Sequence, residues 1–173
     1  GCLIGVRPID AHLEALFDLG LKTKIIPDFY EFTFKSKNLP ATITLKEFSV
    51  TATENILMLA SSLPQKTTIK IAAIEPHVLD LVSFLNKMGA KIKQLPEHTF
   101  EIIGTPHLKG VKRHDIIPDP IEAGSFIIMA AACKANVTVK NVRIDHLDIV
   151  LKKLKEFKFS KPNSLKNFTF SLA

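Results

Sequence analysis

The sequence predicts an α/β fold, with some α+β segregation of helices and strands, built from repeated βαβαββ units. Three observations predict it. The chain resembles itself at a fixed spacing, which indicates a repeated structural unit. Its apolar residues switch between a period of two and a helical period. Proline and glycine stand at the boundaries of these segments, where turns and helix ends require them.

The repeat has a period of about 70 residues. Residues 20–24, followed by Pro27, recur as residues 89–93, followed by Pro96, and a third, degraded copy falls near Lys158. Residues 51–58 align with residues 122–129, and residues 75–78 align loosely with residues 144–147. The chain therefore contains successive copies of one unit.

The first half of a complete unit is a strand, a helix and a second strand. Residues 41–45 alternate between apolar and polar side chains, as a half-buried strand does. Residues 52–63 are apolar on one helical face, and Pro64 stops that helix. Residues 67–73 are rich in β-branched side chains and predict the next strand.

The second half of the unit is a helix followed by a hairpin. Residues 77–88 have helical apolar spacing, and Gly89 is a suitable C-cap. Residues 91–95 and 99–103 then predict two strands joined by a turn at residues 96–98. The order of elements is therefore βαβαββ.

Bulk properties predict a soluble globular protein. The 173 residues are 46% hydrophobic, which is enough to bury a core. The longest apolar run, residues 125–133, is too short to span a bilayer, and no charged leader precedes an apolar signal segment, so we expect a cytoplasmic protein with no membrane partner. The two cysteines do not form a disulfide framework, and Cys133, at the end of an apolar helix, is expected to be a small core residue.

The net charge of +6 admits anionic partners, including sugar nucleotides and nucleic acid. The densest lysine patch, residues 152–158, alternates with apolar residues at helical spacing. We interpret it as the solvated face of an amphipathic helix, because no RNA-binding signature accompanies it. Nucleic acid is therefore the less favoured partner.

The first seven residues carry the strongest chemical signal. Cys2 is flanked by Gly1 and followed by Gly5, so the segment suits a loop that closes over a ligand. Arg7 keeps its charge at neutral pH, and a fixed cation near a thiol lowers the pKa of that thiol. Cys2 is a candidate acid or nucleophile beside an anion, although an inert terminal cysteine remains the alternative.

Four motifs resemble the UDP-N-acetylglucosamine enolpyruvyl transferase (1-carboxyvinyltransferase) family in order and spacing. They are RPIDAH at residues 7–12, SVTATEN at 49–55, AAIEP at 72–76 and IPDPIEAG at 117–124. The resemblance covers essentially the whole chain but only the middle of a family chain more than twice as long. It implies a soluble transferase of peptidoglycan precursor synthesis, needed for cell wall and cell shape, and a target of fosfomycin.

The resemblance also implies an architecture. Family members fold as an inside-out barrel of six βαβαββ units in two domains, with helices inside, and this chain holds an incomplete set. Residues 1–115 correspond to part of the cysteine-loop domain, and residues 116–173 correspond to the start of the second domain, with the crossover near residues 112–118. The first unit lacks its leading strand, so we expect missing flanking segments or a second chain to complete the fold.

The resemblance implies a role for each matching residue. Cys2 is the proton donor to phosphoenolpyruvate, and Arg7 lies against the phosphates. Pro8, Ile9, Asp10 and Ala11 match the segment that holds uracil and ribose, with His12 as a doubtful supporting residue near the cleft. Ser49 and Val50 match the residues that present hydroxyl and backbone groups to the diphosphate at a helix N-terminus. From the residues alone, Ser49 is equally a plain N-cap, and Asp10 a helix-start residue.

Three residues depart from the family pattern. Thr51 replaces a glycine, which predicts crowding at the diphosphate. Glu47 stands where many members have lysine, which predicts like-charge repulsion, so both positions are doubtful binding residues. Pro120 replaces an arginine, and Asp119 and Glu122 are expected to be helix-start residues.

The chain shows no metal-ligand spacing, no GxGxxG and no phosphate loop, so no metal and no cofactor are predicted. The favoured function is transfer of the enolpyruvyl group from phosphoenolpyruvate to the 3-hydroxyl of UDP-N-acetylglucosamine, and the fragment alone is expected to be inactive. The alternatives are a shikimate-phosphate transferase, whose pattern lacks the cysteine loop, a non-catalytic truncated paralogue, and a basic RNA-binding module built from the same unit.

Overall fold

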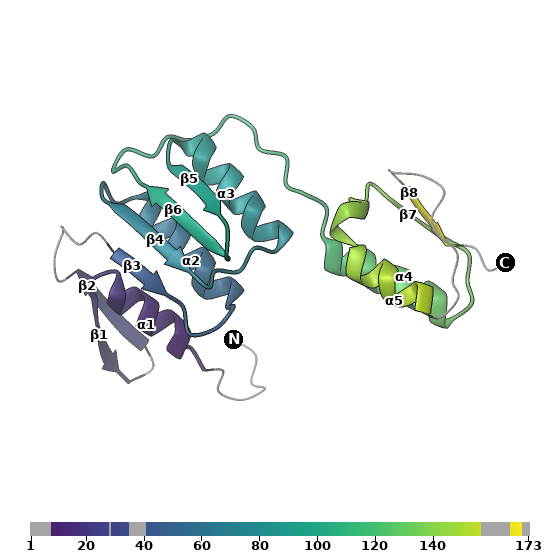
Figure 1. Cartoon of the computed structure of the whole chain (residues 1–173), viewed down its shortest axis with the longest axis horizontal. Coiled ribbons are helices and arrows are strands. Elements are labelled where there is room, and N and C mark those ends of the chain that lie inside the picture. Colours follow the sequence, from purple (N-terminus) through teal and green to yellow (C-terminus); the bar gives the residue numbers. More distant parts are fainter. Residues whose placement is uncertain (1–7, 28, 35–40, 157–166, 171–173) are drawn as a thin grey trace. The chain divides into compact units, whose positions relative to one another are not determined.

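The computed structural model describes residues 8–27, 29–34, 41–156 and 167–170. It divides into two compact units, Gly1–His114 and Asp115–Ala173 (Figure 1). The first unit contains the sheet and helices of the complete predicted repeat. The second contains a shorter set of the same kinds of element.

A four-stranded sheet forms the centre of the first unit. Its strands are β3 (Ala41–Thr44), β4 (Lys66–Lys70), β6 (Thr99–Ile103) and β5 (Lys91–Leu95), in that spatial order. β3 and β4 are parallel and joined through α2 (Val50–Ser61), whereas β6 is antiparallel to both of its neighbours. With α3 (Pro76–Met88) between β4 and β5, the order along the chain is βαβαββ, as predicted. Both helices lie on one face of the sheet (Figure 1).

The core lies between the sheet and these helices. Successive side chains of each strand point to opposite faces of the sheet. Those on the inward face include Ile43, Ile69 and Phe100, which are all fully buried. Ile56 and Leu57 of α2 pack in the same cluster. The outward positions of β3 and β4 carry threonine and lysine, so this sheet has one apolar and one polar face.

Two elements have ends that differ from the sequence prediction by two residues or more, while the strand expected at 41–45 and the helix expected at 77–88 each differ by one residue. The strand expected at residues 67–73 ends at Lys70, because Ile71 takes a left-handed backbone conformation with φ of 56°. The helix expected at residues 52–63 begins at Val50 and ends at Ser61. Hydrophobic periodicity identified both elements, but the local backbone geometry determined where each one ends.

The predicted helix stop at Gly89 is confirmed. Gly89 takes the left-handed conformation, with φ of 112°, and its N–H donates to the carbonyl of Asn86. The hairpin that follows has Leu95 paired with Thr99, and the turn residues Glu97 and His98 both have positive φ. The Asn86 side chain fastens the helix to the hairpin, because it exchanges two hydrogen bonds with the backbone of Ile92.

The segment before β3 forms α1 (Asp10–Asp18) and an antiparallel hairpin of β1 (Leu21–Ile26) and β2 (Phe29–Phe34). This hairpin follows α1 as the β5–β6 hairpin follows α3, in agreement with the sequence repeat. Every residue of β2 is exposed, including four aromatic side chains: Phe29, Tyr30, Phe32 and Phe34. The described residues of the first unit therefore leave part of its apolar surface exposed.

The second unit repeats part of this pattern. Its elements are α4 (Pro120–Ala132), β7 (Val137–Lys140), the 3₁₀ turn η1 (Ile144–His146), α5 (Asp148–Glu156) and β8 (Asn167–Phe170). β7 is antiparallel to β8, as β4 is to β6. Asp119 caps α4 by accepting hydrogen bonds from the N–H groups of Ile121 and Glu122, which confirms its helix-start role. In the part of the chain that the structure describes, the strands form sheets of two, four and two strands and no closed barrel.

The lysine patch and Cys133 had different outcomes. In α5, Leu154 is buried while Lys152, Lys153 and Lys155 are exposed, so the described part of the patch is the solvated face of an amphipathic helix, as predicted.

Cys133 is exposed at the C-cap of α4, so its prediction as a core residue was wrong. The buried face of α4 includes Ala123, Ile127 and Ala130. Cys133 follows the last residue of the helix and does not lie on that face. No helix among the described residues is long and apolar enough to cross a membrane.

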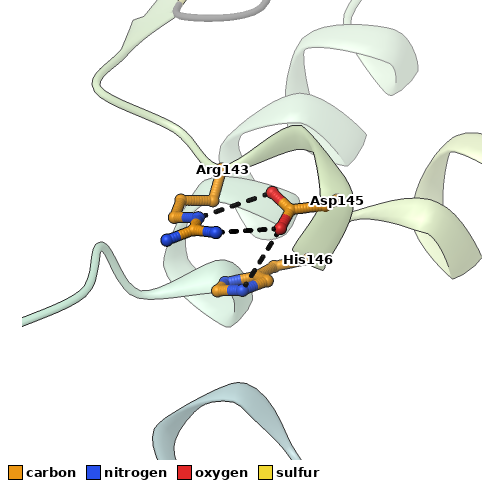
Figure 2. Close-up of polar contacts among 3 residues, drawn as sticks. All are labelled: Arg143, Asp145 and His146. Carbon is orange, nitrogen blue, oxygen red and sulfur yellow. Dashed lines mark hydrogen bonds and ion pairs between the residues drawn. The ribbon is translucent and has the colours of Figure 1, made fainter. Parts of the chain in front are cut away.

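A polar cluster lies on η1 of the second unit (Figure 2). The Arg143 guanidinium donates to both carboxylate oxygens of Asp145, at 3.5 and 3.1 Å, and Nε2 of His146 lies 3.7 Å from the same carboxylate. The hydrogen bond from Arg143 is the main cause that lowers the pKa of Asp145 below its ordinary value. Because the pair is exposed, its contribution to stability is small.

We predict that Arg143→Gln raises the pKa of Asp145 towards its ordinary value. A carboxyl group with a depressed folded-state pKa adds stability above its unfolded pKa, and that stability is lost as pH falls through the folded pKa. The free energy of unfolding of the variant should therefore fall less steeply than that of the unsubstituted chain as the pH is lowered through the acid range. Carbon-detected NMR titration of Asp145 measures the shift, with Lys152→Gln on α5 as the charge-matched control. An unchanged Asp145 titration in Arg143→Gln contradicts this assignment.

Candidate functional site

The structure brings together two of the segments that the sequence singled out. Residues 8–12 lead into α1, and residues 46–51 lead into α2. Nε2 of His12 lies 2.8 Å from Oγ1 of Thr51, and Lys46 forms an ion pair with Glu14. The N-terminal ends of α1 and α2 therefore lie side by side, and unpaired N–H groups at helix N-termini favour an anion.

In the first segment, α1 begins at Asp10 without a side-chain cap. Ile9 occupies the N-cap position, and its carbonyl accepts from the N–H groups of His12 and Leu13 at 3.0 Å. Asp10 stands in the first turn, where a carboxylate is favoured, which confirms it as a helix-start residue. Pro8 and Asp10 are exposed, whereas Ala11 packs partly against the core. Exposed positions of this segment are thus available to a ligand.

The second segment is capped by Ser49. Its Oγ accepts a hydrogen bond of 3.3 Å from the N–H of Ala52, which is the N-cap role that the sequence offered as an alternative to diphosphate binding. The side chain of Val50 packs partly against the core. Val50 is therefore only partly accessible to a ligand.

Thr53 is a site-supporting residue that the sequence reasoning missed. It is fully buried, its hydroxyl donates to the carbonyl of Ser49 at 2.7 Å, and it accepts from the N–H of Ala73 at 3.0 Å. Two of the four motifs are therefore joined by one side chain. The sequence did contain one signal for this role, because Thr53 lies on the apolar face of a predicted helix, where a hydroxyl group needs a hydrogen-bond partner.

The described part of the site carries mostly negative side chains. Asp10, Glu14 and Glu47 surround Lys46, and the hydrogen bond with Glu14 is the main cause that raises the pKa of Lys46 above its ordinary value. Glu47 itself is exposed. The structure gives no geometry for the expected cation, Arg7, or for the expected thiol, Cys2, because both lie outside the described residues.

An apolar groove of about 660 Å³ adjoins this site. It lies between α1, α2 and the β1–β2 hairpin, and His12 stands in its wall. The remaining lining residues are Ile9, Leu13, Leu16, Leu21, Tyr30, Phe32, Asn55, Met58, Leu59 and Ser62. This lining suits an apolar side chain or helix better than a diphosphate. Among the described residues, no cluster of three or more His, Cys, Asp or Glu could hold a metal ion.

Comparison with known proteins identifies the family. The chain matches the EPSP synthase (3-phosphoshikimate 1-carboxyvinyltransferase) family over residues 1–161. The chain belongs to this family. Its curated relatives include UDP-N-acetylglucosamine 1-carboxyvinyltransferase 1 of Caldanaerobacter subterraneus subsp. tengcongensis, 45% identical over 157 residues. Another is UDP-N-acetylglucosamine 1-carboxyvinyltransferase 2 of Carboxydothermus hydrogenoformans, 46% identical over 157 residues. Each alignment covers 90% of this chain and 37% of the relative.

Solved structures agree on the fold of this family member. The enolpyruvyl transferase NikO from Streptomyces tendae matches with a TM-score of 0.79 at 20% identity, over 96% of this chain and 42% of that one. EPSP synthase from Acinetobacter baumannii matches with a TM-score of 0.69 at 17% identity, over 95% and 40%. The predicted fold class is therefore confirmed, and the chain spans well under half the length of its relatives.

Proposed function

We propose that this chain is part of a UDP-N-acetylglucosamine 1-carboxyvinyltransferase and carries the cysteine loop and part of the sugar-nucleotide site. The observation that carries the proposal is the juxtaposition of residues 8–12 and 49–51 at two adjacent helix N-termini. These are the segments that the resemblance assigns to the nucleoside and the diphosphate. Relatives of that name at 45% and 46% identity support the same substrate class.

In the proposed reaction, the enolpyruvyl group of phosphoenolpyruvate passes to the 3-hydroxyl of UDP-N-acetylglucosamine, and phosphate leaves. The thiol of Cys2 donates a proton to the methylene carbon while the 3-hydroxyl loses its proton and adds to the adjacent carbon; a proton then leaves the new methyl group as phosphate departs, which restores the double bond. A thiol suits this transfer because its pKa lies close enough to neutral. Arg7 holds the phosphates, and residues 8–11 hold uracil and ribose. Ser49 and the backbone of Val50 face the diphosphate.

The proposed enzyme needs more protein than this chain. We assign residues 1–115 to the cysteine-loop domain and residues 116–173 to the start of the second domain, in a cytoplasmic protein of peptidoglycan synthesis. The groove beside α1 and the exposed aromatic side chains of β2 support the need for a further segment or chain, since apolar surface of this kind is normally covered. The proposed active protein therefore includes the parts that the relatives have beyond this chain.

A non-catalytic paralogue is the second candidate. Glu47 is exposed beside the candidate diphosphate segment, where its carboxylate would repel an anion. The described residues there offer one cation, Lys46, and it is already paired with Glu14. This candidate predicts a folded chain with no response to the sugar nucleotide.

Calorimetric titration with UDP-N-acetylglucosamine tests the proposal. We expect saturable binding that weakens about tenfold or more in Arg7→Ala, because a charge-assisted hydrogen bond to a phosphate contributes roughly 1.5–3 kcal/mol. Lys152→Ala, which removes an exposed charge of α5, is the matched control and should bind as the unsubstituted chain does. The same titration is repeated with a single-stranded RNA oligonucleotide at two salt concentrations.

Three results are informative. Sugar-nucleotide binding that depends on Arg7 but not on Lys152 supports the transferase. Strongly salt-dependent RNA binding without a sugar-nucleotide response favours the RNA-binding alternative instead. Absence of both responses in a folded chain favours the paralogue.

A further inference from the structure

The contact between His12 and Thr51 joins two helices from widely separated parts of the chain. Nε2 of His12 and Oγ1 of Thr51 are 2.8 Å apart across a sequence separation of 39 residues. Thr51 is exposed, whereas His12 is partly buried. The other link between these segments, the Lys46–Glu14 ion pair, has side chains exposed by 63% and 51%, so it is expected to be weak.

The surroundings of the ring determine which of its nitrogens carries the proton. Nδ1 of His12 is buried and has no hydrogen-bond partner among the residues that the structure describes. A buried N–H without an acceptor is rarer in proteins than a buried acceptor without a donor. The neutral ring therefore keeps its proton on Nε2, from which it donates to Oγ1 of Thr51. In this arrangement the buried surroundings of Nδ1 select the tautomer, and the contact with the Thr51 hydroxyl fixes the orientation of the ring.

This contact requires the residue that departs from the family pattern. A glycine at position 51 has no side chain and leaves Nε2 of His12 without this partner. The sequence predicted that Thr51 crowds the diphosphate, but in the structure its hydroxyl is directed to His12. The departure therefore adds a link between the two segments.

We propose that Thr51 is a positioning residue of the sugar-nucleotide site and acts through His12. Its hydroxyl fixes the imidazole and holds residues 8–12 against the N-terminus of α2, so the two binding segments are ordered before the ligand arrives. Ordering a site in advance raises affinity because less conformational freedom is lost on binding. The proposal rests on the proposed function for its ligand, but the tautomer of His12 can be measured without any ligand.

The test uses Thr51→Val, Thr51→Ser and Thr51→Gly in the whole chain. Long-range proton–nitrogen NMR of the His12 ring reports the tautomer, and calorimetry reports the affinity for UDP-N-acetylglucosamine. Valine keeps the shape of threonine without the hydroxyl, and serine keeps the hydroxyl. We expect serine to retain both readouts, and valine and glycine to perturb the ring and weaken binding about 3- to 10-fold, as loss of one hydrogen bond implies. Lys152→Met, which removes an exposed charge of α5 outside the candidate site, should change neither readout.

Three results would overturn the positioning role of Thr51, and a fourth would contradict the proposed function. An unchanged His12 ring spectrum in Thr51→Val shows that the hydroxyl does not position the ring. Tighter binding in Thr51→Gly shows that Thr51 crowds the ligand. A perturbed ring with unchanged affinity removes the positioning role but leaves the proposed function intact, whereas no binding by the unsubstituted chain contradicts the proposed function and, with it, the role of Thr51 at that site.

Discussion

Gly104→Ala is expected to lower the free energy of unfolding of the first unit by about 3 kcal/mol, the upper range for overpacking. A Cβ at Gly104 would lie less than 3.0 Å from the backbone carbonyl oxygens of Ala60, Ser61 and Leu63. Backbone oxygens at the end of α2 cannot rotate away as a side chain can. The next residue, Thr105, donates its N–H to the carbonyl of Ser61 at 2.8 Å, so the clash cannot be relieved without breaking that contact.

Gly110→Ala is the matched control, because no heavy atom lies within 4 Å of the Cβ that it would add. It should change stability by no more than about 0.5 kcal/mol. Urea unfolding followed through the amide signals of β6 separates the first unit from the second. Equal midpoints for the two alanine variants would show that the segment after β6 does not pack against the end of α2 as described.

Cys2→Ser is expected to reduce enolpyruvyl transfer about 100-fold or more when the parts that the relatives have beyond this chain are supplied. General acid catalysis contributes roughly 10²- to 10⁴-fold, and a serine hydroxyl is too weak an acid to replace a thiol near neutral pH. Binding of UDP-N-acetylglucosamine should be retained, because the proposed nucleoside and diphosphate contacts are assigned to other residues. The readouts are the rate of phosphate release and the affinity for the sugar nucleotide.

Cys133→Ser is the control, since the Cys133 thiol is exposed at the C-cap of α4 and is not assigned to the site. It should leave the rate unchanged. Peptide mapping after brief treatment with fosfomycin gives an independent check: Cys2 should be alkylated faster than Cys133. Equal labelling of the two cysteines, or full activity in Cys2→Ser, contradicts the assignment of Cys2 as the acid.

The His114 side chain illustrates a contact that local sequence signals could not supply. Its Nε2 lies 3.1 Å from Oδ1 of Asp80, its Nδ1 lies 3.1 Å from Nζ of Lys87, and its ring packs edge-on against Phe84. The three partners are on one face of α3, at helical spacing. This periodicity predicted α3, but nothing in the sequence indicated that the segment after β6 would pack against that helix.

The sequence by itself determined the repeated unit, the order of its elements and the family. These follow from short-range patterns: alternation in β3, β5 and β6, helical spacing in α2 and α3, and the left-handed C-cap at Gly89. It also identified both halves of the candidate site, because each half is a contiguous motif at a helix start. Such signals need only neighbouring residues to be read.

Tertiary structure alone decided how those motifs meet and which side chains they engage. The hydrogen bond from the Ala73 N–H to Thr53 joins residues 20 positions apart, and the contact between His12 and Thr51 joins residues 39 positions apart. The exposure of Cys133 depends on which face of α4 is buried. Local sequence cannot specify such contacts, because they form only when packing of the apolar faces has fixed the helices in place. The crowding expected from Thr51 stays a prediction, whereas its contact with His12 comes from the fold alone.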